Sequence, residues 1–242
     1  MTLSGAQRIE IVGETAFVLN ANGRIVHNNE PTPTAGPRLW MAGCATGNRF
    51  LLHEGVSAST AAKVAELMQD EPPLATINAA PQHLTRYIEL LGAEKEARGI
   101  NYALPEDVSI ACSAQRIWSG TDEGDRLVAA LDTNGMPHGL YAMGFINTGE
   151  FWQPWCALLE DGVVASICFA ARLGKKGADA GVATAPEFRG QGYAAAVTAG
   201  WAAHPALARR VLGYSTTVDN VSSQRIAERL GLRMIGATVT LS

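Results

Sequence analysis

The sequence of 242 residues has no apolar run long enough to cross a membrane, which takes about 20 consecutive apolar residues. Its first ten residues, MTLSGAQRIE, lack the basic-then-apolar pattern of a secretory signal. Its four cysteines lie far apart, without CxxC spacing or Cys/His pairing, so the sequence predicts neither a metal site nor a disulfide framework. We therefore expect a cytoplasmic protein without a metal ion.

Basic residues are also few and mostly scattered. The sequence has 19 Lys and Arg and 23 Asp and Glu, which gives a net charge of −4. A partner such as nucleic acid or a membrane surface requires a basic patch, so we expect neither. Arg172, Lys175 and Lys176 form a tight basic cluster in LGKKGADAG, which we interpret as a solvated hairpin turn.

The N-terminal part shows short apolar runs followed by helical periodicity. Up to about residue 56 we expect short strands and turns, including a hairpin in FVLNANGRIVH that turns at Asn22-Gly23. Apolar residues at helical spacing then predict helices over residues 57–69 and 81–97.

The string INYALPED, residues 100–107, is short, polar and contains a proline, and therefore predicts a domain boundary. We expect an N-terminal accessory region over residues 1–104 and a second domain over residues 105–242. Strands and helices alternate in the second domain, with a hairpin at Asp161-Gly162 and a capping box from Ser119 to Asp122. This alternation predicts an α/β fold.

The string EFRGQGYAAA, residues 187–196, places two glycines before an alanine-rich helix. Gly190 and Gly192 allow backbone N–H groups to surround an anion without obstruction by a Cβ atom. These groups lie at a helix N-terminus, where the helix dipole favours phosphate, and Arg189 can add a charge-assisted contact. The string therefore predicts a phosphate-binding loop.

A dinucleotide-binding loop is one alternative, because Gly190, Gly192 and Ala195 satisfy G-x-G-x-x-G/A and Asp219 is placed as the ribose acid. In such a unit the strand runs directly into the first glycine, whereas residues 185–189 intervene here. Only about fifty residues follow the first glycine, too few for the remainder of a doubly wound sheet. The context excludes this alternative.

The run Arg189-Gly190-Gln191-Gly192-Tyr193-Ala194 matches [RQ]-x-x-G-x-[GA] and resembles the acyl-CoA pyrophosphate loop of the GNAT acetyltransferase superfamily. The surrounding order is similar too, with the strand GVAT before the loop and YSTT, Asn220, Ser223 and LGL after it. The resemblance covers residues 107–242 and extends to a bacterial subgroup of the superfamily. It implies a mixed central sheet with splayed strands, flanked by helices.

In this superfamily the strands on either side of the loop separate, and the pantetheine arm of acyl-CoA lies between them. Residues 179–184 and 211–217 would be these strands. The resemblance implies thioester contacts from the backbone of Val182, Ala183 and Thr184. Asn220 would contact the pantetheine amides or cap the last helix, and Ser223 would contact CoA or be an ordinary first-turn serine.

Acyl transfer to an amine depends on a base more than on an acid. An amine of pKa near 10.4 must lose its proton at a cost of about 4.6 kcal/mol at pH 7, whereas a thiol of pKa near 8.5 leaves at a cost of about 2 kcal/mol. Asp179 stands where related sequences carry an acid and is our first candidate base, through a water chain. Glu150 is the second, and His138 and His204 are further candidates, for which we favour the interpretation as surface histidines.

Many GNAT enzymes carry a tyrosine, the usual general acid, seven residues after the asparagine. This position is Ala227 here. Tyr214, on the strand beside the thioester, is the substitute candidate, with a packed strand tyrosine as the alternative. Three aromatic residues either wall an acceptor pocket or belong to the core: Phe151, Trp152 and Trp155.

The resemblance implies an acetyl-CoA-dependent N-acetyltransferase that acts on the amine of a small-molecule acceptor by direct attack on the thioester. The missing tyrosine motivates an alternative, a non-catalytic module that binds acyl-CoA as a sensor or interaction protein. The apolar faces of the two N-terminal helices, and the single strand after the last helix, predict that the N-terminal region packs on the catalytic domain or forms a homodimer contact.

Overall fold

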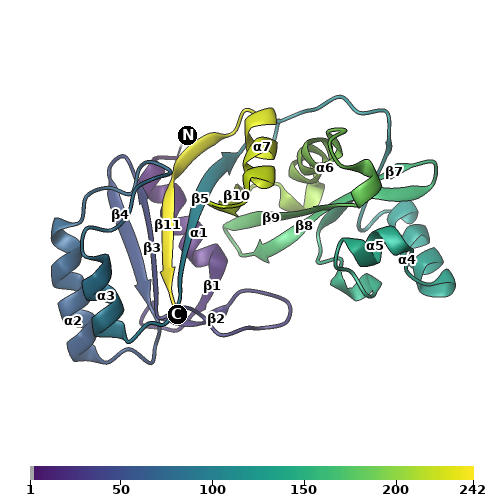
Figure 1. Cartoon of the computed structure of the whole chain (residues 1–242). Helices are drawn as coiled ribbons and strands as arrows, with labels where there is room; N and C mark the ends of the chain where they lie inside the picture. The colour runs from purple at the N-terminus through teal and green to yellow at the C-terminus, as the bar shows by residue number, and fades with distance from the viewer. Residues whose placement is uncertain (1–2) are drawn as a thin grey trace.

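The computed structural model describes residues 3–242. A twisted nine-stranded mixed sheet runs through these residues, with helices on both faces and a two-stranded ribbon beside it (Figure 1). The strand order is β4-β3-β11-β5-β10-β9-β8-β7-β6, and β9 and β10 form a parallel pair in an otherwise antiparallel sheet. No helix in this part of the chain combines the length and the apolar character that a membrane crossing needs.

The sheet and the ribbon are built from β1 (Phe17–Leu19), β2 (Ile25–Asn28), β3 (Leu39–Cys44), β4 (Gly47–Leu52), β5 (Glu96–Leu104), β6 (Gln115–Trp118), β7 (Trp155–Glu160), β8 (Val163–Leu173), β9 (Gly177–Thr184), β10 (Val211–Thr217) and β11 (Arg233–Leu241). The helices are α1 (Gly5–Ala16), α2 (Ala58–Leu67), α3 (Leu84–Leu91), α4 (Asp122–Asn134), α5 (His138–Ala142), α6 (Tyr193–Ala202) and α7 (Val221–Arg229). Short 3-10 helices are η1 (Met68–Asp70), η2 (Thr148–Glu150), η3 (Pro186–Phe188) and η4 (Pro205–Leu207).

The two faces of the sheet carry separate apolar cores. Helices α2, α3, α6 and α7 cover one face, where Tyr214 of β10 packs near Trp201 of α6, and Val239 of β11 packs near Tyr87 of α3. Helices α1, α4 and α5 cover the other face (Figure 1). Successive strand residues alternate between these faces, so neighbouring residues of β9 and β10 have different surroundings.

The N-terminal part contributes strands to the same sheet as the remainder of the chain. Strand β5 lies between β10 and β11, and β3 pairs with the far edge of β11. Residues 100–104, which we expected at a domain boundary, therefore lie in the middle of the sheet as part of β5 and not in a loop. The division into an accessory region and an acetyltransferase domain stays a prediction, although the sheet crosses it without interruption.

Local turn signals are confirmed. Gly23 has φ +70° in the turn between β1 and β2, and Asp161 and Gly162 have φ 49° and 79° between β7 and β8. Positive φ at both central residues, as at Asp161-Gly162, is the geometry of a two-residue type I′ hairpin. The β1–β2 connection is a longer loop over residues 20–24, in which Gly23 has the positive φ. The Asn-Gly and Asp-Gly dipeptides therefore mark both hairpins correctly.

Helix α1 corrects the expectation of strands throughout the first 56 residues. Ser4 caps it by accepting a hydrogen bond from the Gln7 backbone N–H at 3.2 Å, and the Gln7 side chain accepts one from the Ser4 N–H at 2.9 Å. This reciprocal arrangement is a capping box. Ile9 is fully buried against the sheet, so tertiary packing holds the helix in place.

Two other helix boundaries also differ from expectation. Helix α4 takes Thr121 as its N-cap, because the Thr121 hydroxyl accepts a hydrogen bond from the Gly124 N–H at 3.1 Å, and the capping box expected from Ser119 is absent at that residue. Helix α3 ends at Leu91, because Gly92 adopts the left-handed conformation with φ 59°. The helix expected over residues 81–97 is therefore shorter, and β5 begins at Glu96.

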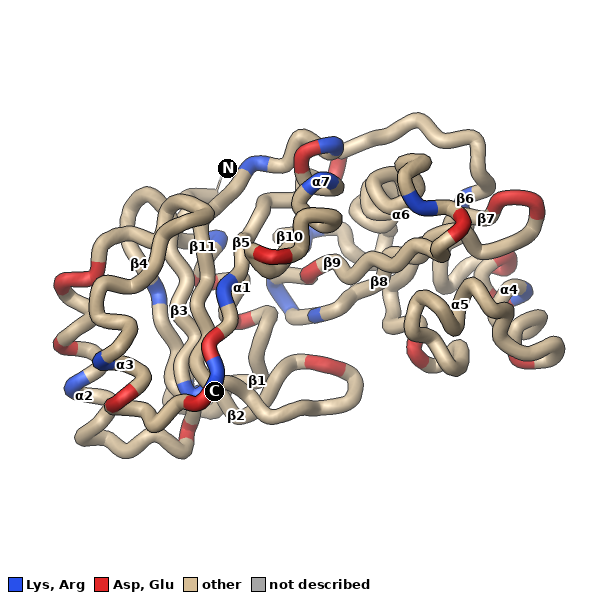
Figure 2. Tube along the Cα trace, viewed as in Figure 1, with Lys and Arg blue, Asp and Glu red and all other residues tan. Residues whose placement is uncertain are grey.

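The basic turn between β8 and β9 is exposed, yet it is tied to the N-terminal part. Lys176 pairs with Glu14 of α1 at 2.9 Å, and Arg172 pairs with Glu30 at 2.5 Å. Figure 2 shows acidic and basic residues scattered over the trace, without a large patch of one sign in this view. Surface pairs of this kind contribute little stability. The Lys176 pair joins the turn to α1, and the Arg172 pair joins β8 to the segment after β2.

Candidate active site

Strands β9 and β10 separate halfway along their length. Their parallel pairing runs only from Gly177 opposite Val211 to Asp179 opposite Gly213. Beyond that point β9 continues beside β8 as far as Thr184, and β10 continues beside β5 as far as Thr217. The backbone edges that face each other across the gap therefore lack a strand partner, which is the splayed arrangement expected for this fold.

A cavity of about 600 Å³ lies on the α1 face of the sheet, next to this gap. Its sheet side includes Asp179 and Gly181 of β9 and Ser215 of β10. Helix α1 contributes Arg8 and Thr15, so residues from both ends of the chain form one cavity. Of the two arrangements predicted for the N-terminal region, packing against the second part is the one observed, and a dimer contact stays a prediction.

Asp179 is the acidic side chain of this cavity. Burial raises the pKa of Asp179 to about 6, although a hydrogen bond from Ser215 and the charge of Arg172 oppose the rise. Gly213 directly opposite leaves room for the carboxylate, because a Cβ atom there would lie 2.8 Å from Asp179 Oδ1. A carboxylate of this pKa is still largely ionised at pH 7 and is matched to proton transfer near neutral pH.

The glycine loop has the geometry of an anion site. Gly190 and Gly192 have φ of 76° and 92°, values that only glycine adopts readily. Gly192 is the N-cap of α6, and among the described residues no side chain caps this helix. The first amides of α6 therefore point outward without a capping partner, as a bound diphosphate requires.

The long side chains of the loop contact neighbouring protein groups. Arg189 Nε donates to the Thr184 carbonyl at 3.3 Å, and Gln191 Nε2 donates to the Glu187 carbonyl at 3.1 Å. The Tyr193 hydroxyl donates to Glu160 at 2.8 Å. These contacts brace the loop against β7 and β9, so that its backbone is held ready for a ligand.

Arg229, at the end of α7, lies against the loop and was not identified from the sequence. A Cβ atom on Gly192 would lie 2.6 Å from Arg229 Cζ, so the guanidinium occupies the space beside this glycine. A second cation at the same helix N-terminus strengthens the anion site. The basic residue in the last turn of α7 was visible in the sequence, but its approach to Gly192 depends on how α7 packs beside α6.

The residues expected after the loop occupy structural positions. Asn220 Oδ1 accepts a hydrogen bond from the Ser223 N–H at 3.0 Å, so Asn220 caps α7. Ser223 Oγ lies 2.6 Å from the Tyr214 hydroxyl. Tyr214 is 1% exposed, and burial raises its pKa to about 12. Contacts of Asn220 and Ser223 with CoA, and an acid role for Tyr214, stay predictions.

Tyr214 and Asp179 lie on opposite faces of the sheet. Tyr214 packs in the same core as Ala227, on the α6 and α7 side, whereas Asp179 lines the cavity on the α1 side. The tyrosine ring of β10 therefore lies in the core that holds Ala227, the position where many GNAT enzymes carry a tyrosine. Asp179 still pairs with Gly213, the neighbour of Tyr214, so the sheet itself lies between the two side chains.

The three backbone positions expected at the thioester lie on the part of β9 that has left β10. Ser166 Oγ donates to the Ala183 carbonyl at 2.8 Å, and the same hydroxyl lies 2.8 Å from Thr184 Oγ1. Val182 is partly buried against the α6 core. Their contact with a thioester stays a prediction.

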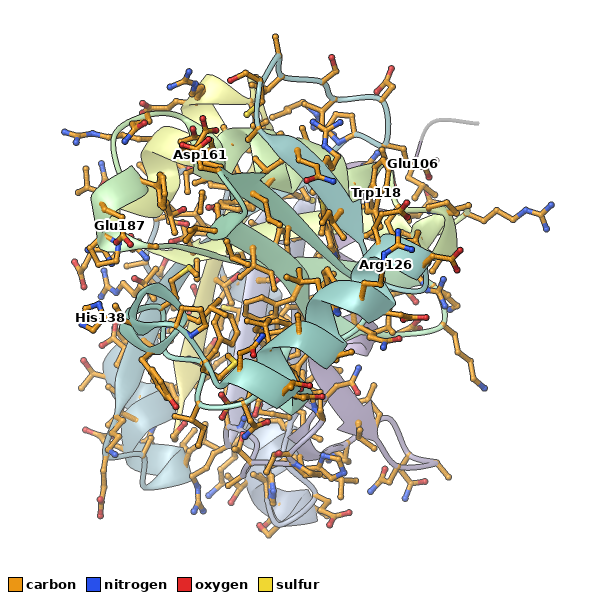
Figure 3. All side chains as sticks on the ribbon, turned by 90° about the vertical axis from the view of Figure 1, so that its right-hand side faces the viewer. Glu106, Trp118, Arg126, His138, Asp161 and Glu187 are labelled. Carbon is orange, nitrogen blue, oxygen red and sulfur yellow. The ribbon has the colours of Figure 1, made fainter. Side chains whose placement is uncertain are left out.

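The alternative bases lie elsewhere. The Glu150 carboxylate accepts a hydrogen bond from the Ile146 N–H within its own loop, and it is absent from the cavity lining. Figure 3 shows His138 projecting outward from α5 near Glu187, as expected for a surface histidine. His204 corrects that expectation, since it is buried, with Nε2 3.1 Å from the Ser119 carbonyl, and burial lowers its pKa.

The aromatic segment belongs to a core on the α4 and α5 side. Phe151 and Trp155 are buried and pack with Phe145, and Trp152 packs edge-on against Phe169. None of the three predicted wall residues lines the cavity described above. The interpretation as core is the one observed.

Comparison with known proteins gives the family of this chain. The family described as Acetyltransferase (GNAT) family matches residues 115–232, and the chain is a member of the GNAT superfamily. Acyl-CoA-dependent acetyl transfer is the general activity of this family. No curated protein matches the chain.

Several solved structures are similar to this chain. A GNAT-family protein from Novosphingobium aromaticivorans is 22% identical with a TM-score of 0.44, over 62% of this chain and 65% of that chain. This chain thus spans less than two thirds of that relative. A GNAT-family acetyltransferase from Colwellia psychrerythraea is 18% identical with a TM-score of 0.44, over 80% and 75% of the two chains. A GCN5-related N-acetyltransferase-like protein from Streptococcus suis is 14% identical with a TM-score of 0.45, over 99% and 100%.

Proposed function

We propose that this protein is an acetyl-CoA-dependent N-acetyltransferase acting on a small-molecule amine in the cytoplasm. The observation that carries the proposal is the position of Asp179, which lines a cavity next to the gap between β9 and β10. At the far end of β9 lie the glycine loop and the N-terminus of α6. A glycine loop at a helix N-terminus, a strand gap and a partly buried carboxylate follow one another along β9 and its loop.

The loop fits the diphosphate of CoA. Gly192 leaves the α6 amides open, and Arg229 places a guanidinium group beside this glycine. Arg189, in the same loop, donates to the Thr184 carbonyl. When bound, acetyl-CoA would supply the acetyl thioester. The protein groups fix its orientation, because a diphosphate held at α6 directs the remainder of the molecule toward the gap between the strands.

Asp179 would accept the proton of the acceptor amine, directly or through a water molecule. With a pKa of about 6, its carboxylate is a stronger base than an ordinary aspartate and is still about 90% ionised at pH 7. Its hydrogen bond from Ser215 orients the carboxylate, and the proton it accepts is held at Asp179 until water removes it. This step addresses the largest cost of the reaction, about 4.6 kcal/mol for the amine proton.

A non-catalytic acyl-CoA-binding module is the second candidate function. Two observations favour it. Ala227, which is 1% exposed, stands where many GNAT enzymes carry the tyrosine that acts as general acid, and Tyr214 is buried. Both functions require acyl-CoA binding, so only turnover separates them.

A thiol-release assay with acetyl-CoA, across a panel of amino acids, polyamines and aminoglycosides, tests the proposal. We expect release of the CoA thiol that depends on the presence of at least one amine of the panel. Tight acetyl-CoA binding by calorimetry, with no release across the panel, would instead support the non-catalytic module.

A further inference from the structure

The cavity holds one arginine that no acidic side chain of the described residues neutralises. Arg8 of α1 lines it together with Arg98 of β5 and Arg172 of β8. Arg172 pairs with Glu30 at 2.5 Å, and Arg98 pairs with Glu96 at 2.5 Å. Within residues 3–242 no carboxylate lies within ion-pair distance of Arg8, and its Nε is buried without a hydrogen-bond partner.

A guanidinium whose Nε is buried without a hydrogen-bond partner is unfavourable unless an anion pairs with it. Burial lowers the pKa of Arg8, and the nearby charge of Arg233 on β11 lowers it further. A buried charged donor without a partner forfeits its hydration. An anion in the cavity would restore both a counter-charge and a hydrogen-bond acceptor to Arg8.

Arg8 and Asp179 stand at different ends of the cavity. Thr15, on the same side of α1, touches the start of β9, because a Cβ atom on Gly177 would overlap the Thr15 hydroxyl. Arg8 precedes Thr15 by seven residues, so their Cα atoms are about 10 Å apart along the helix. Arg8 therefore lies about two helical turns from the point where α1 touches β9, and the two charged residues line different parts of the cavity.

We propose that the acceptor is an elongated zwitterionic amine, whose amine faces Asp179 and whose carboxylate binds Arg8. This proposal rests on the N-acetyltransferase function proposed above. A carboxylate is favoured over a phosphate because, within the described residues, Arg8 is the one arginine of the cavity lining without an ion pair, and its fork of N–H donors matches two carboxylate oxygens. A cavity of about 600 Å³ accommodates a chain of several methylene groups between the two ends.

A matched pair of acceptors tests the inference on the full-length chain. 6-Aminohexanoate and 6-aminohexanamide have the same length and the same reactive amine, and only the first carries a charge at the far end. We expect kcat/KM for the carboxylate to exceed that for the amide by about 10- to 100-fold. Arg8→Gln should bring this ratio to about one, and Arg8→Lys should retain part of it.

The control is Arg86→Gln, since Arg86 is an exposed arginine of α3 that pairs with Glu89, and this variant should keep the wild-type ratio. Thermal melting and acetyl-CoA affinity establish that Arg8→Gln is folded. If Arg8→Gln does not fold, the inference is tested by the ratio of kcat/KM for the carboxylate to that for the amide, measured in the wild type and in Arg8→Lys.

Equal turnover of the two amines by the wild type, or an unchanged ratio in a folded Arg8→Gln variant, would overturn the inference. Faster turnover of 6-aminohexyl phosphate would overturn the assignment of a carboxylate. If neither amine is acetylated, the N-acetyltransferase function fails, and calorimetry then tests the anion site alone. Tighter binding of 6-aminohexanoate than of the amide, lost in Arg8→Gln, would support the site, whereas equal binding would overturn it.

Discussion

Replacing Asp179 with asparagine should lower activity and raise stability at the same time. The asparagine keeps the shape and the contact with Ser215, but it cannot take a proton from the amine. Loss of a general base costs about 10²- to 10⁴-fold in rate, so we expect kcat/KM at pH 7 to fall by at least about 100-fold. Acetyl-CoA affinity should stay nearly unchanged, because the carboxylate lies away from the phosphate loop.

The stability gain follows from the raised pKa. Asp179 titrates at about 6 in the folded protein against an ordinary 3.8, so the folded state holds its proton more tightly and loses stability as pH rises through this interval. At 1.36 kcal/mol per pKa unit the loss above pH 6 is at most about 3 kcal/mol. Asparagine does not ionise, so the variant does not lose this stability. For a chain of 242 residues, each kcal/mol of added stability raises Tm by about 2–4 °C.

Steady-state kinetics and thermal melting from pH 4 to pH 10 measure both effects. The Tm difference between variant and wild type should grow between pH 4 and 6 and then level off. The kinetic defect should shrink toward pH 10, where the amine loses its own proton. Asp70→Asn, at an exposed position, is the control and should change neither. A defect independent of pH, or a less stable variant, would refute the role of Asp179 as a base.

Three further predictions concern the loop and the sheet. Gly192→Asp should weaken acetyl-CoA binding by at least about 100-fold in calorimetry, because its side chain enters the phosphate site, whereas Gly23→Asp in the β1–β2 turn should leave the affinity unchanged. Arg229→Gln should weaken acetyl-CoA binding by about tenfold or more without changing the acceptor KM. The control Arg225→Gln, at an exposed position of the same helix, should keep the wild-type affinity. Equal affinities of Arg229→Gln and the wild type for acetyl-CoA would exclude a phosphate role for Arg229. A fragment of residues 105–242 lacks β5, which separates β10 from β11, and should aggregate or lose activity in light scattering and thiol-release assays; a soluble, active fragment would contradict this.

The parts of the site that could be predicted from sequence depend on local geometry. Gly190 and Gly192 need positive φ, and the Asn-Gly and Asp-Gly turns have the same requirement, so single residue types mark them. These features need no knowledge of distant segments. Asp179 was proposed from the resemblance to related sequences, and its position in the cavity lining agrees with that proposal, whereas its role as a base stays a prediction.

The parts that could not be predicted depend on pairing between distant segments. Strand β5 looked like a linker because its polar residues and proline suggested a boundary, yet β10 and β11 enclose it from both sides. Helix α1 has two glycines and a modest apolar face, and the sheet beneath it supplies the missing stabilisation. The approach of Arg8 to the cavity and of Arg229 to Gly192 follows from that packing, which the sequence pattern does not specify.

Detection of the acetylated product by mass spectrometry, after incubation of the full chain with ¹³C-acetyl-CoA and a set of amines, tests the central claim most directly. The labelled acetyl group should appear on an amine nitrogen of the acceptor with wild type, and at least about 100-fold more slowly with Asp179→Asn at pH 7. Labelled acetyl-CoA that binds tightly but yields no acetylated amine would contradict the enzymatic function and identify a binding module instead.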